Sequence, residues 1–146
     1  MRLTLHTDYA LRALVFLATA GEAGSTAQII AERYRISRNH LVKVLQRLRA
    51  LGYLETTRGR GGGVRLAMPA QDINIGAVVR RTEDDLVLVE CFNPATNTCP
   101  LIGACGLESK LGEAFNAFMA VLDRCTVADV ALNQRSWARL FPPLES

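Results

Sequence analysis

Apolar residues recur every three or four positions near the N-terminus, which is the period of an amphipathic helix. We expect a first helix with Thr7 as its N-cap, whose inner face carries Leu11, Leu14, Val15 and Ala18. The segment GEAGS then makes a turn. Ser25 and Gln28 have the spacing of a capping box, which predicts a second helix whose inward side chains include Ile29, Ile30 and Tyr34.

A third amphipathic segment covers SRNHLVKVLQRLRALG, residues 37–52. Ser37 is a favourable N-cap, and Gly52 is a typical C-terminal stop. The apolar positions form one stripe, made by Leu41, Val44, Leu45, Leu48 and Leu51. Most of the charged side chains fall off this stripe. Two extended segments on either side of a glycine-rich tip, RGRGGG, then predict a β-hairpin that ends at Pro69.

The second half of the chain is predicted to hold a short helix, a loop and a long helix. The short helix covers residues 73–83 with a cap near Asn74, and residues 84–106 have the prolines and small polar residues of a loop. From about Leu107 to Arg124 the apolar residues follow the spacing of a coiled-coil seam, namely Leu107, Leu111, Ala114, Phe118, Val121 and Cys125. Because one helix cannot bury this seam alone, we expect a homodimer. A short helix near residues 127–133 and a loose tail, packed by Trp137, complete the chain.

These elements predict a mainly α-helical fold with three parts. Residues 1–82 form a winged helix-turn-helix, residues 83–106 a cysteine-rich loop, and residues 107–146 a dimerisation helix with a C-terminal tail. The third helix would lie in the major groove of double-stranded DNA, with contacts from Ser37, Arg38, Asn39, His40 and Lys43. The hairpin would contact phosphate or the minor groove through Arg58, Arg60, Gly61, Gly62 and Arg65.

The distribution of charge supports a DNA-binding module. Residues 1–81 carry 13 Lys and Arg against 5 Asp and Glu, a net charge of +8, whereas residues 82–146 carry 4 against 9, a net charge of −5, which together give +3. A positive first half is what phosphate binding requires. Any single arginine could equally be a solvated surface charge, but the charge, the helix caps and the hairpin agree.

Composition narrows the class of protein further. With 49% hydrophobic residues the chain can bury a core, yet it contains no uninterrupted apolar run long enough to span a membrane. Asp8 and Arg12 interrupt the N-terminal apolar run, so we interpret that run as a first helix and not as a secretion signal, and expect a cytoplasmic protein. The sequence shows no nucleophile–base arrangement and no phosphate loop with a Walker lysine, so we do not expect an enzyme.

Three cysteines lie in the predicted loop, with seven residues between Cys91 and Cys99 and five between Cys99 and Cys105. In a reducing compartment such thiols are more often metal ligands than disulfides. The gaps are wider than those of zinc knuckles and suit a loop folded around an iron–sulfur cluster. Three thiolates leave one ligand to be supplied by another residue or a small molecule. Cys125 is interpreted as a structural thiol on the apolar seam, and His6 and His40 as surface or packing residues.

Five segments carry a combined resemblance to a known family: LTxxTDYALRAL, SRNHLVKVLQRL, RGRGGGVRLA, INIGAVVRRTE and CPLIGAC. Together they resemble the Rrf-type winged-helix regulators and, within that family, the nitric-oxide-sensing repressors. The resemblance covers about residues 1–133. It implies a homodimeric repressor that binds a DNA operator, holds one iron–sulfur cluster per protomer and responds to nitric oxide.

The resemblance also assigns the ligands. It matches Cys91, Cys99 and Cys105 to the family's three cysteine ligands and implies that Asp8 of the other protomer is the fourth, with Arg12 near the site. Without the resemblance, Asp8 would be interpreted as a helix-start acid paired with Arg12. The family sensors that have an aspartate ligand favour a 4Fe–4S cluster, and a 2Fe–2S cluster stays open.

Two departures and several alternatives bear on this assignment. The related cluster-biogenesis regulators have a ligand histidine where this chain has Leu107, which argues against that branch. The seven-residue first gap is longer than in several relatives, an insertion that a loop tolerates. The signal could instead be iron availability, cluster supply or redox state. A metal-free thiol sensor, with a disulfide such as Cys99–Cys105, and a structural zinc site are further alternatives.

Overall fold

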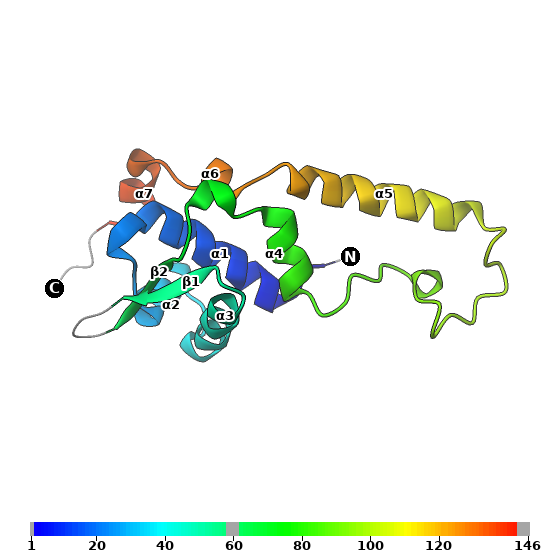
Figure 1. Ribbon diagram of the computed structural model, residues 1–146, viewed down its shortest axis with the longest axis horizontal. Coiled ribbons are helices and arrows are strands. Elements are labelled where there is room, and N and C mark those ends of the chain that lie inside the picture. Colours follow the sequence, from blue (N-terminus) through cyan, green and yellow to red (C-terminus); the bar gives the residue numbers. More distant parts are fainter. Residues whose placement is uncertain (1, 58–61, 143–146) are drawn as a thin grey trace.

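The structure is a computed structural model that describes residues 2–57 and 62–142. It is mainly helical with one two-stranded antiparallel hairpin, as the sequence predicts. In Figure 1, most helices gather into one body, and α5 extends away from it. The elements in chain order are α1 (Leu5–Ala20), η1 (Gly21–Ala23), α2 (Ala27–Tyr34), α3 (Arg38–Ala50), β1 (Leu54–Thr57), β2 (Gly63–Leu66), η2 (Ala70–Asp72), α4 (Ile75–Thr82), η3 (Glu90–Phe92), α5 (Gly106–Asp123), α6 (Val127–Val130) and α7 (Gln134–Leu140).

Helix α1 is the centre of the core, and α3, α4 and α6 pack against it. Its apolar side chains meet those of the other helices in one cluster, whose fully buried members include Leu14, Leu17, Ile30, Leu41, Leu48, Val78 and Val127. Burying such side chains is the main source of stability for a domain of this size. We call this packed unit, formed by α1–α4, the hairpin, α6 and α7, the winged-helix body.

The first two helices begin at residues other than those predicted. Helix α1 is capped by Thr4, whose hydroxyl accepts from the amide of Thr7. Thr7 is instead fully buried, and its hydroxyl donates to Thr82 Oγ1 at 2.9 Å, which ties α1 to α4. Helix α2 is capped by Thr26 and not by Ser25, so the predicted capping box is wrong. Ser25 forms a β-bridge with the hairpin, an alternative that local spacing does not reveal.

The predicted caps of α3 and α4, the Gly52 stop and the hairpin are confirmed, whereas the helix predicted over residues 73–83 covers Ile75–Thr82. Ser37 caps α3, and Gly52 follows the helix with a φ of 83°, the left-handed conformation that glycine adopts readily. Strands β1 and β2 pair in antiparallel register from Leu54↔Leu66 to Thr57↔Gly63. Asn74 caps α4 through a hydrogen bond from the amide of Ala77.

The C-terminal segment is more ordered than predicted. The short helix expected near residues 127–133 ends at Val130, and the segment expected to be a loose tail forms α7, which Asn133 caps. Trp137 does pack this segment, since its ring centroid lies 4.6 Å from that of Phe16. Tyr34 and Phe141 extend the same aromatic cluster. Contacts with α1 and α2, rather than local pattern, therefore hold α7 in place.

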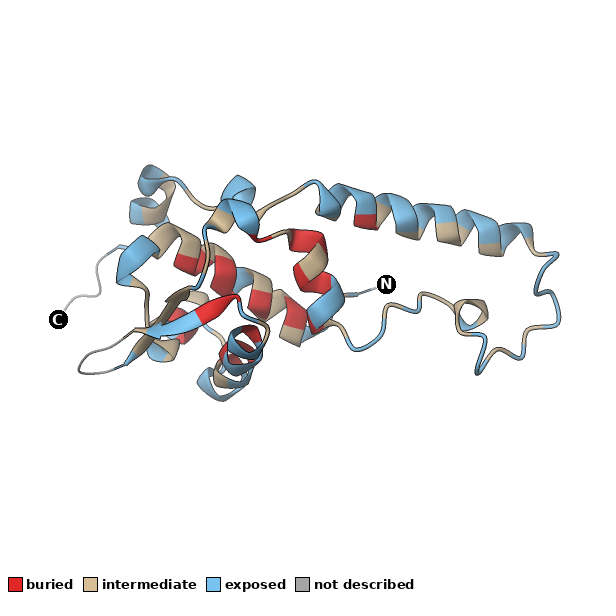
Figure 2. Cartoon of the chain, in the orientation of Figure 1, coloured by how far each residue is buried: buried red, intermediate tan, exposed pale blue. Residues whose placement is uncertain are grey.

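Helix α5 leaves most of its surface uncovered, as Figure 2 shows by its exposed and half-buried colours. Met119 is its one buried side chain, while Leu107 is 65% exposed and Val121 is 58% exposed. The chain itself therefore covers only part of the predicted seam: Leu107, Ala114 and Val121 are exposed, and Leu111, Phe118 and Cys125 are half-buried. Within residues 2–57 and 62–142, no helix is long and apolar enough to cross a bilayer.

The buried hydroxyl pair between Thr7 and Thr82 predicts a measurable stability effect. Thr7→Val keeps the shape of the side chain but removes the donor of this hydrogen bond, so the free energy of unfolding should fall by about 1 kcal/mol. Thr56→Val, at an exposed position of β1, is the control and should change stability by less than about 0.5 kcal/mol. Equal denaturation midpoints for Thr7→Val and the unmodified protein would contradict the role of the pair.

Candidate functional site

The predicted recognition helix has one buried and one exposed face. Its apolar stripe lies in the core, through Leu41, Val44, Leu45 and Leu48. The predicted DNA-contacting side chains are all exposed, namely Ser37, Arg38, Asn39, His40 and Lys43. Ser37 Oγ also accepts from the amide of His40 at 3.4 Å, so Ser37 fixes the start of the helix. The N-terminal end of α3 therefore presents cationic and amide groups to solvent, the chemistry that contacts base edges and phosphates.

Two arginines that sequence reasoning did not single out fix α3 against its neighbours. Arg47 Nη2 donates to the carbonyl of Arg81 at 3.2 Å and so joins α3 to the end of α4. The guanidinium of Arg81 lies 5.2 Å from the ring centroid of Tyr53, within cation–π range. His6 and His40, predicted to be surface or packing residues, line one hollow of about 220 Å³ between α1 and α3.

Strand β2 of the hairpin is held against the turn after α1 near the tip-side end of the strand. Ser25 and Val64 exchange two backbone hydrogen bonds, of 2.9 and 2.8 Å. Gly24 has a φ of 61°, and an added Cβ there would collide with the Val64 carbonyl, so only glycine fits. Of the predicted tip residues, Gly62 has a φ of 36°, whereas Arg58, Arg60 and Gly61 lie outside the described residues.

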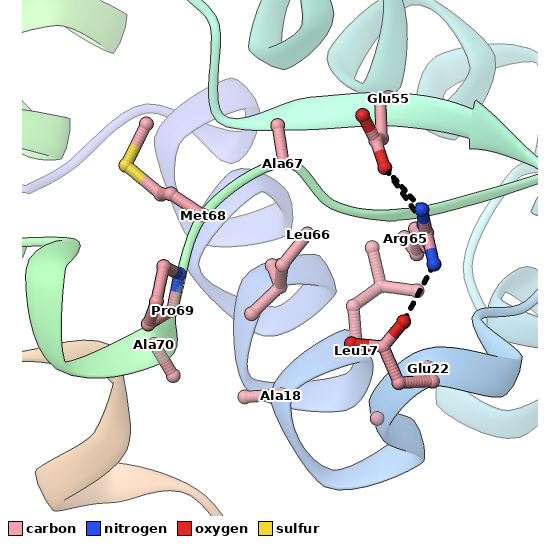
Figure 3. A pocket seen from close by; sticks show the side chains of 11 residues that line it. Leu17, Ala18, Glu22, Glu55, Arg65, Leu66, Ala67, Met68, Pro69 and Ala70 are labelled. Carbon is pink, nitrogen blue, oxygen red and sulfur yellow. Dashed lines mark hydrogen bonds and ion pairs between the residues drawn. The ribbon is translucent and has the colours of Figure 1, made fainter.

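Arg65 forms two ion pairs that the sequence did not predict. Its guanidinium lies 2.6 Å from Glu22 and 2.7 Å from Glu55, at the edge of a hollow of about 480 Å³ (Figure 3), and its contact with phosphate stays a prediction. Two carboxylates thus already balance its charge. Sequence spacing could not have revealed the pair with Glu22, because 43 residues separate the two.

The three loop cysteines are free thiols and half-buried. Hydrogen bonds shape the loop between the first two: Glu90 Oε1 accepts from the amide and the hydroxyl of Thr98, at 2.7 and 2.6 Å. Asn97 Oδ1 accepts from the amide of Cys99 at 2.9 Å. The loop therefore bends back on itself and brings Cys91 and Cys99 to the same region, without any helical or strand period.

The loop and the start of α5 contain several groups that carry a negative charge when they are deprotonated. Burial raises the pKa of the Cys91 thiol, and the carboxylate of Glu108 and the thiols of Cys99 and Cys105 raise it further. The sulfurs of Cys99 and Cys105 are thus close enough to affect the ionisation of Cys91. A positively charged centre would relieve this repulsion, because a metal stabilises the thiolate form.

The donor set fits an iron–sulfur cluster but is incomplete in one chain. Within the described residues, no group of three or more His, Cys, Asp or Glu side chains is assembled around a point that could hold a single metal ion. A cluster is larger than a single ion, so the thiolates that would hold it need not gather around one point. Asp8 lies in α1, where its Oδ2 forms an ion pair with Nη2 of Arg12 at 2.7 Å. One loop thus supplies three soft donors, one fewer than full cysteine ligation of a cluster would use.

Comparison with known proteins places this chain in a family of transcriptional regulators. The sequence profile of the Rrf2 family, described as "Iron-dependent Transcriptional regulator", matches residues 3–133. The chain belongs to the Rrf2 family. The transcriptional regulator NsrR of Bacillus subtilis is 53% identical over 143 residues, which are 97% of each chain. NsrR of Geobacillus kaustophilus is 48% identical over 142 residues, again 97% of each chain.

Solved structures agree with this assignment. The IscR of T. potens superposes with a TM-score of 0.71 at 25% identity, over 89% of this chain and 85% of that one. CymR, the global cysteine regulator of B. subtilis, superposes with a TM-score of 0.73 at 23% identity, over 90% of this chain and 96% of that one, and shows the fold alone. The predicted fold class and the resemblance to Rrf-type regulators, including those named NsrR, are confirmed. The expectation that the chain is not an enzyme is confirmed by the same membership.

The hydrogen bonds of Glu90 predict its titration. Bonds from the hydroxyl and the amide of Thr98 lower the pKa of Glu90 below its ordinary value of 4.5. The bent loop is therefore stabilised by this carboxylate at neutral pH, and that contribution is lost as the pH falls below 4.5 through the folded-state pKa.

A carboxyl-detected NMR titration checks the direction of this shift. We expect the midpoint of Glu90 below 4.5, and a rise toward 4.5 in Thr98→Val, which removes the hydroxyl donor. A midpoint at or above 4.5 in the unmodified protein would show that the loop does not hold this bend in solution.

Proposed function

We propose that the chain is a DNA-binding transcriptional repressor whose affinity for its operator is controlled by an iron–sulfur cluster and by nitric oxide. The observation that carries the proposal is the pairing of two features in one Rrf2-family chain: a winged-helix body with an exposed cationic recognition helix, and three free cysteines in one loop at the far end of α5. Membership of a family of transcriptional regulators supports the first feature, and relatives named NsrR and IscR support the second.

In this proposal three segments have separate roles, namely DNA binding, cofactor binding and dimerisation. Residues 1–82 bind DNA, with Ser37, Arg38, Asn39, His40 and Lys43 in the major groove and Arg58, Arg60, Gly61 and Gly62 of the hairpin at the backbone or minor groove. Residues 83–106 hold the cofactor, and residues 107–146 form the dimerisation helix and the tail. A second copy of the chain covers the apolar face of α5. The dimer would read two half-sites about one helical turn apart.

The cofactor site is proposed to join the two protomers. Cys91, Cys99 and Cys105 of one chain supply three ligands, and Asp8 of the partner chain supplies the fourth, with Arg12 beside it. The Asp8 carboxylate is available as a ligand, because Asp8 and Arg12 are about two-fifths exposed and their ion pair stabilises the protein little. That ion pair is readily exchanged for a contact with the cofactor. We propose a 4Fe–4S cluster. The amount of iron measured per protomer would distinguish it from a 2Fe–2S cluster.

Asp8 is the ligand that makes the site responsive. When bound, the cluster supplies iron that reacts with nitric oxide. Asp8 would be the one hard donor among soft thiolates and therefore the weakest ligand. Without Asp8 as a ligand, α1 of one protomer would be free of the loop of the other, and the spacing of the recognition helices would change. A hundredfold loss of operator affinity requires about 2.7 kcal/mol of such coupling.

The direct test uses protein purified without oxygen. Iron and acid-labile sulfide should be present, and nitric oxide should both change the visible spectrum and lower affinity for the operator by about a hundredfold. Undiminished operator affinity after the spectrum has changed would refute control by nitric oxide. Absence of iron and sulfide would leave a metal-free thiol sensor, and zinc alone would indicate a structural site.

A second candidate keeps the regulator class and changes the signal. The family's description as iron-dependent favours iron availability, and cluster supply or redox state would act through the same cysteines. Titrating iron chelator, oxidant and nitric oxide separately against DNA binding distinguishes these signals, because each should release DNA only if it alters the ligand set.

Arg38 tests the contact with DNA bases. If its guanidinium pairs with guanine, Arg38→Ala should weaken binding to the preferred sequence by about 1–3 kcal/mol and leave binding to unrelated DNA nearly unchanged. Lys43→Ala is the comparison, since a phosphate contact should weaken binding to all sequences and reduce its dependence on salt. Equal losses on both kinds of DNA for Arg38→Ala would assign that residue to phosphate.

Asp8 tests the fourth ligand. Asp8→Ala should keep a cluster on three cysteines but change its electron paramagnetic resonance or resonance Raman signature and its rate of reaction with nitric oxide. Glu22→Ala, which removes another carboxylate of the same body, is the control and should leave the spectrum unchanged. A spectrum identical to that of the unmodified protein would remove Asp8 from the ligand set.

A further inference from the structure

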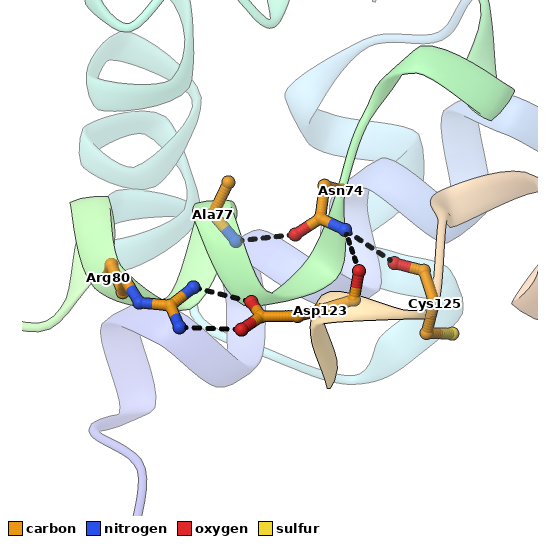
Figure 4. Close-up of polar contacts among 5 residues, drawn as sticks. All are labelled: Asn74, Ala77, Arg80, Asp123 and Cys125. Carbon is orange, nitrogen blue, oxygen red and sulfur yellow. Dashed lines mark hydrogen bonds and ion pairs between the residues drawn. The ribbon is translucent and has the colours of Figure 1, made fainter. Parts of the chain in front are cut away.

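Helix α5 packs against α4, and its last residue, Asp123, meets the start of α4. Arg80 and Asp123 form a two-pronged ion pair there, with Nη1–Oδ1 at 2.5 Å and Nη2–Oδ2 at 2.8 Å (Figure 4). Two parallel bonds between guanidinium and carboxylate fix an orientation as well as a distance. The angle at which α5 leaves the body is therefore specified by side chains.

Asn74 joins the same two elements from the other side. Its Oδ1 accepts from the amide of Ala77 and so caps α4, while its Nδ2 donates to the Asp123 carbonyl at 2.7 Å. The backbone adds a further connection, since the amide of Ile75 donates to the Cys125 carbonyl at 2.9 Å. One asparagine thus satisfies the start of α4 and the end of α5 together.

Gly76 makes room for the ion pair. A Cβ added at this position would collide with the Asp123 carboxylate, so any other residue would displace that carboxylate from its pair with Arg80. Its backbone has no positive φ, so an L-residue would be tolerated in the helix itself. The absence of a side chain at position 76 is explained by the approach of Asp123 and not by the conformation of α4.

The ion pair is better suited to setting geometry than to stabilising the fold. Arg80 is 45% exposed and Asp123 is 41% exposed, and pairs at such positions contribute little to the free energy of folding. The next residue after Arg80 also contacts α3, because the Arg81 carbonyl accepts from Arg47. Helix α4 is therefore held at its start by α5 and at its end by the recognition helix.

We propose that Asn74, Gly76, Arg80 and Asp123 form a positioning joint that fixes the angle between α5 and the winged-helix body, and so sets the spacing of the two recognition helices in the dimer. This inference rests on the proposed function, because it takes α5 as the dimerisation helix. The four residues need not touch DNA or the cofactor. They act by holding each recognition helix at the distance that two half-sites require.

The test compares two DNA probes. A duplex selected by the unmodified protein from a random-sequence pool is the full-site probe, and the same duplex with one half scrambled is the half-site probe. Asp123→Asn and Arg80→Met should each lower affinity for the full site by about tenfold and change affinity for the half-site by less than about twofold. A general loss of stability would lower both affinities together.

The two variants also separate geometry from charge. Arg80→Met removes a positive charge and Asp123→Asn a negative one, so a purely electrostatic effect would change DNA affinity in opposite directions. The joint predicts a loss on the full site for both. The exchanged pair, Arg80→Asp with Asp123→Arg, should recover at least part of the full-site affinity.

Gly76→Ala disturbs the joint without changing any charge. It should lower full-site affinity like the charged variants, although alanine favours the helix itself. Lys110→Gln is the control, since it removes a more exposed ion pair on the same helix, between Lys110 and Glu113. It should leave both affinities unchanged.

The outcomes distinguish this inference from the function on which it rests. Full-site affinity in Asp123→Asn, Arg80→Met and Gly76→Ala equal to that of the unmodified protein would overturn the joint alone. Equal losses on both probes would also overturn it, because the residues would then act on stability or on DNA contact. If the unmodified protein gains nothing from the second half-site, the dimeric function and the joint both fail.

Discussion

The uncovered apolar face of α5 is the constraint on which the rest of the structure depends. Leu107 and Val121 are more than half exposed on a helix that contacts its own chain mainly through α4. Exposed apolar surface of this kind indicates a partner surface. The cysteine loop lies at the N-terminal end of the same helix, and in the proposed function its three thiolates require a fourth ligand from elsewhere. A second copy of the chain would both cover the apolar face of α5 and supply the fourth ligand.

The winged-helix body needs no such partner. Its core is complete around α1, and within the described residues every buried side-chain polar atom has a hydrogen-bond partner. The exposed end of α3 is therefore carried on a rigid support, and a rigid body can be moved as a unit. The proposed regulation then requires no change inside the body. It requires only that the two bodies of a dimer change their distance, which the attachment of α5 to α4 would control.

Local signals predicted most of the fold. The stripe of α3, its Ser37 cap and its Gly52 stop are all contained in sixteen consecutive residues, so periodicity was sufficient. The cap of α1 was wrong because Thr7 finds its partner in Thr82, 75 residues away. Helix α7 was missed because its stability comes from Phe16 and Tyr34 and not from its own pattern. The pairs made by Arg65 and Arg80 could not be predicted for the same reason, whereas residue type alone was enough to propose the cysteines and the polar end of α3 as functional sites.

Native mass spectrometry of the full chain, purified and sprayed without oxygen, tests the central claim most directly, because it reports subunit number and bound iron and sulfide together. The chain has a mass of 16.0 kDa, and we expect a dimer of twice that mass carrying two iron–sulfur clusters. A monomer that retains a complete cluster would contradict the proposal that a second copy covers α5 and completes the ligand set. A dimer without iron or sulfide would contradict the proposed cofactor.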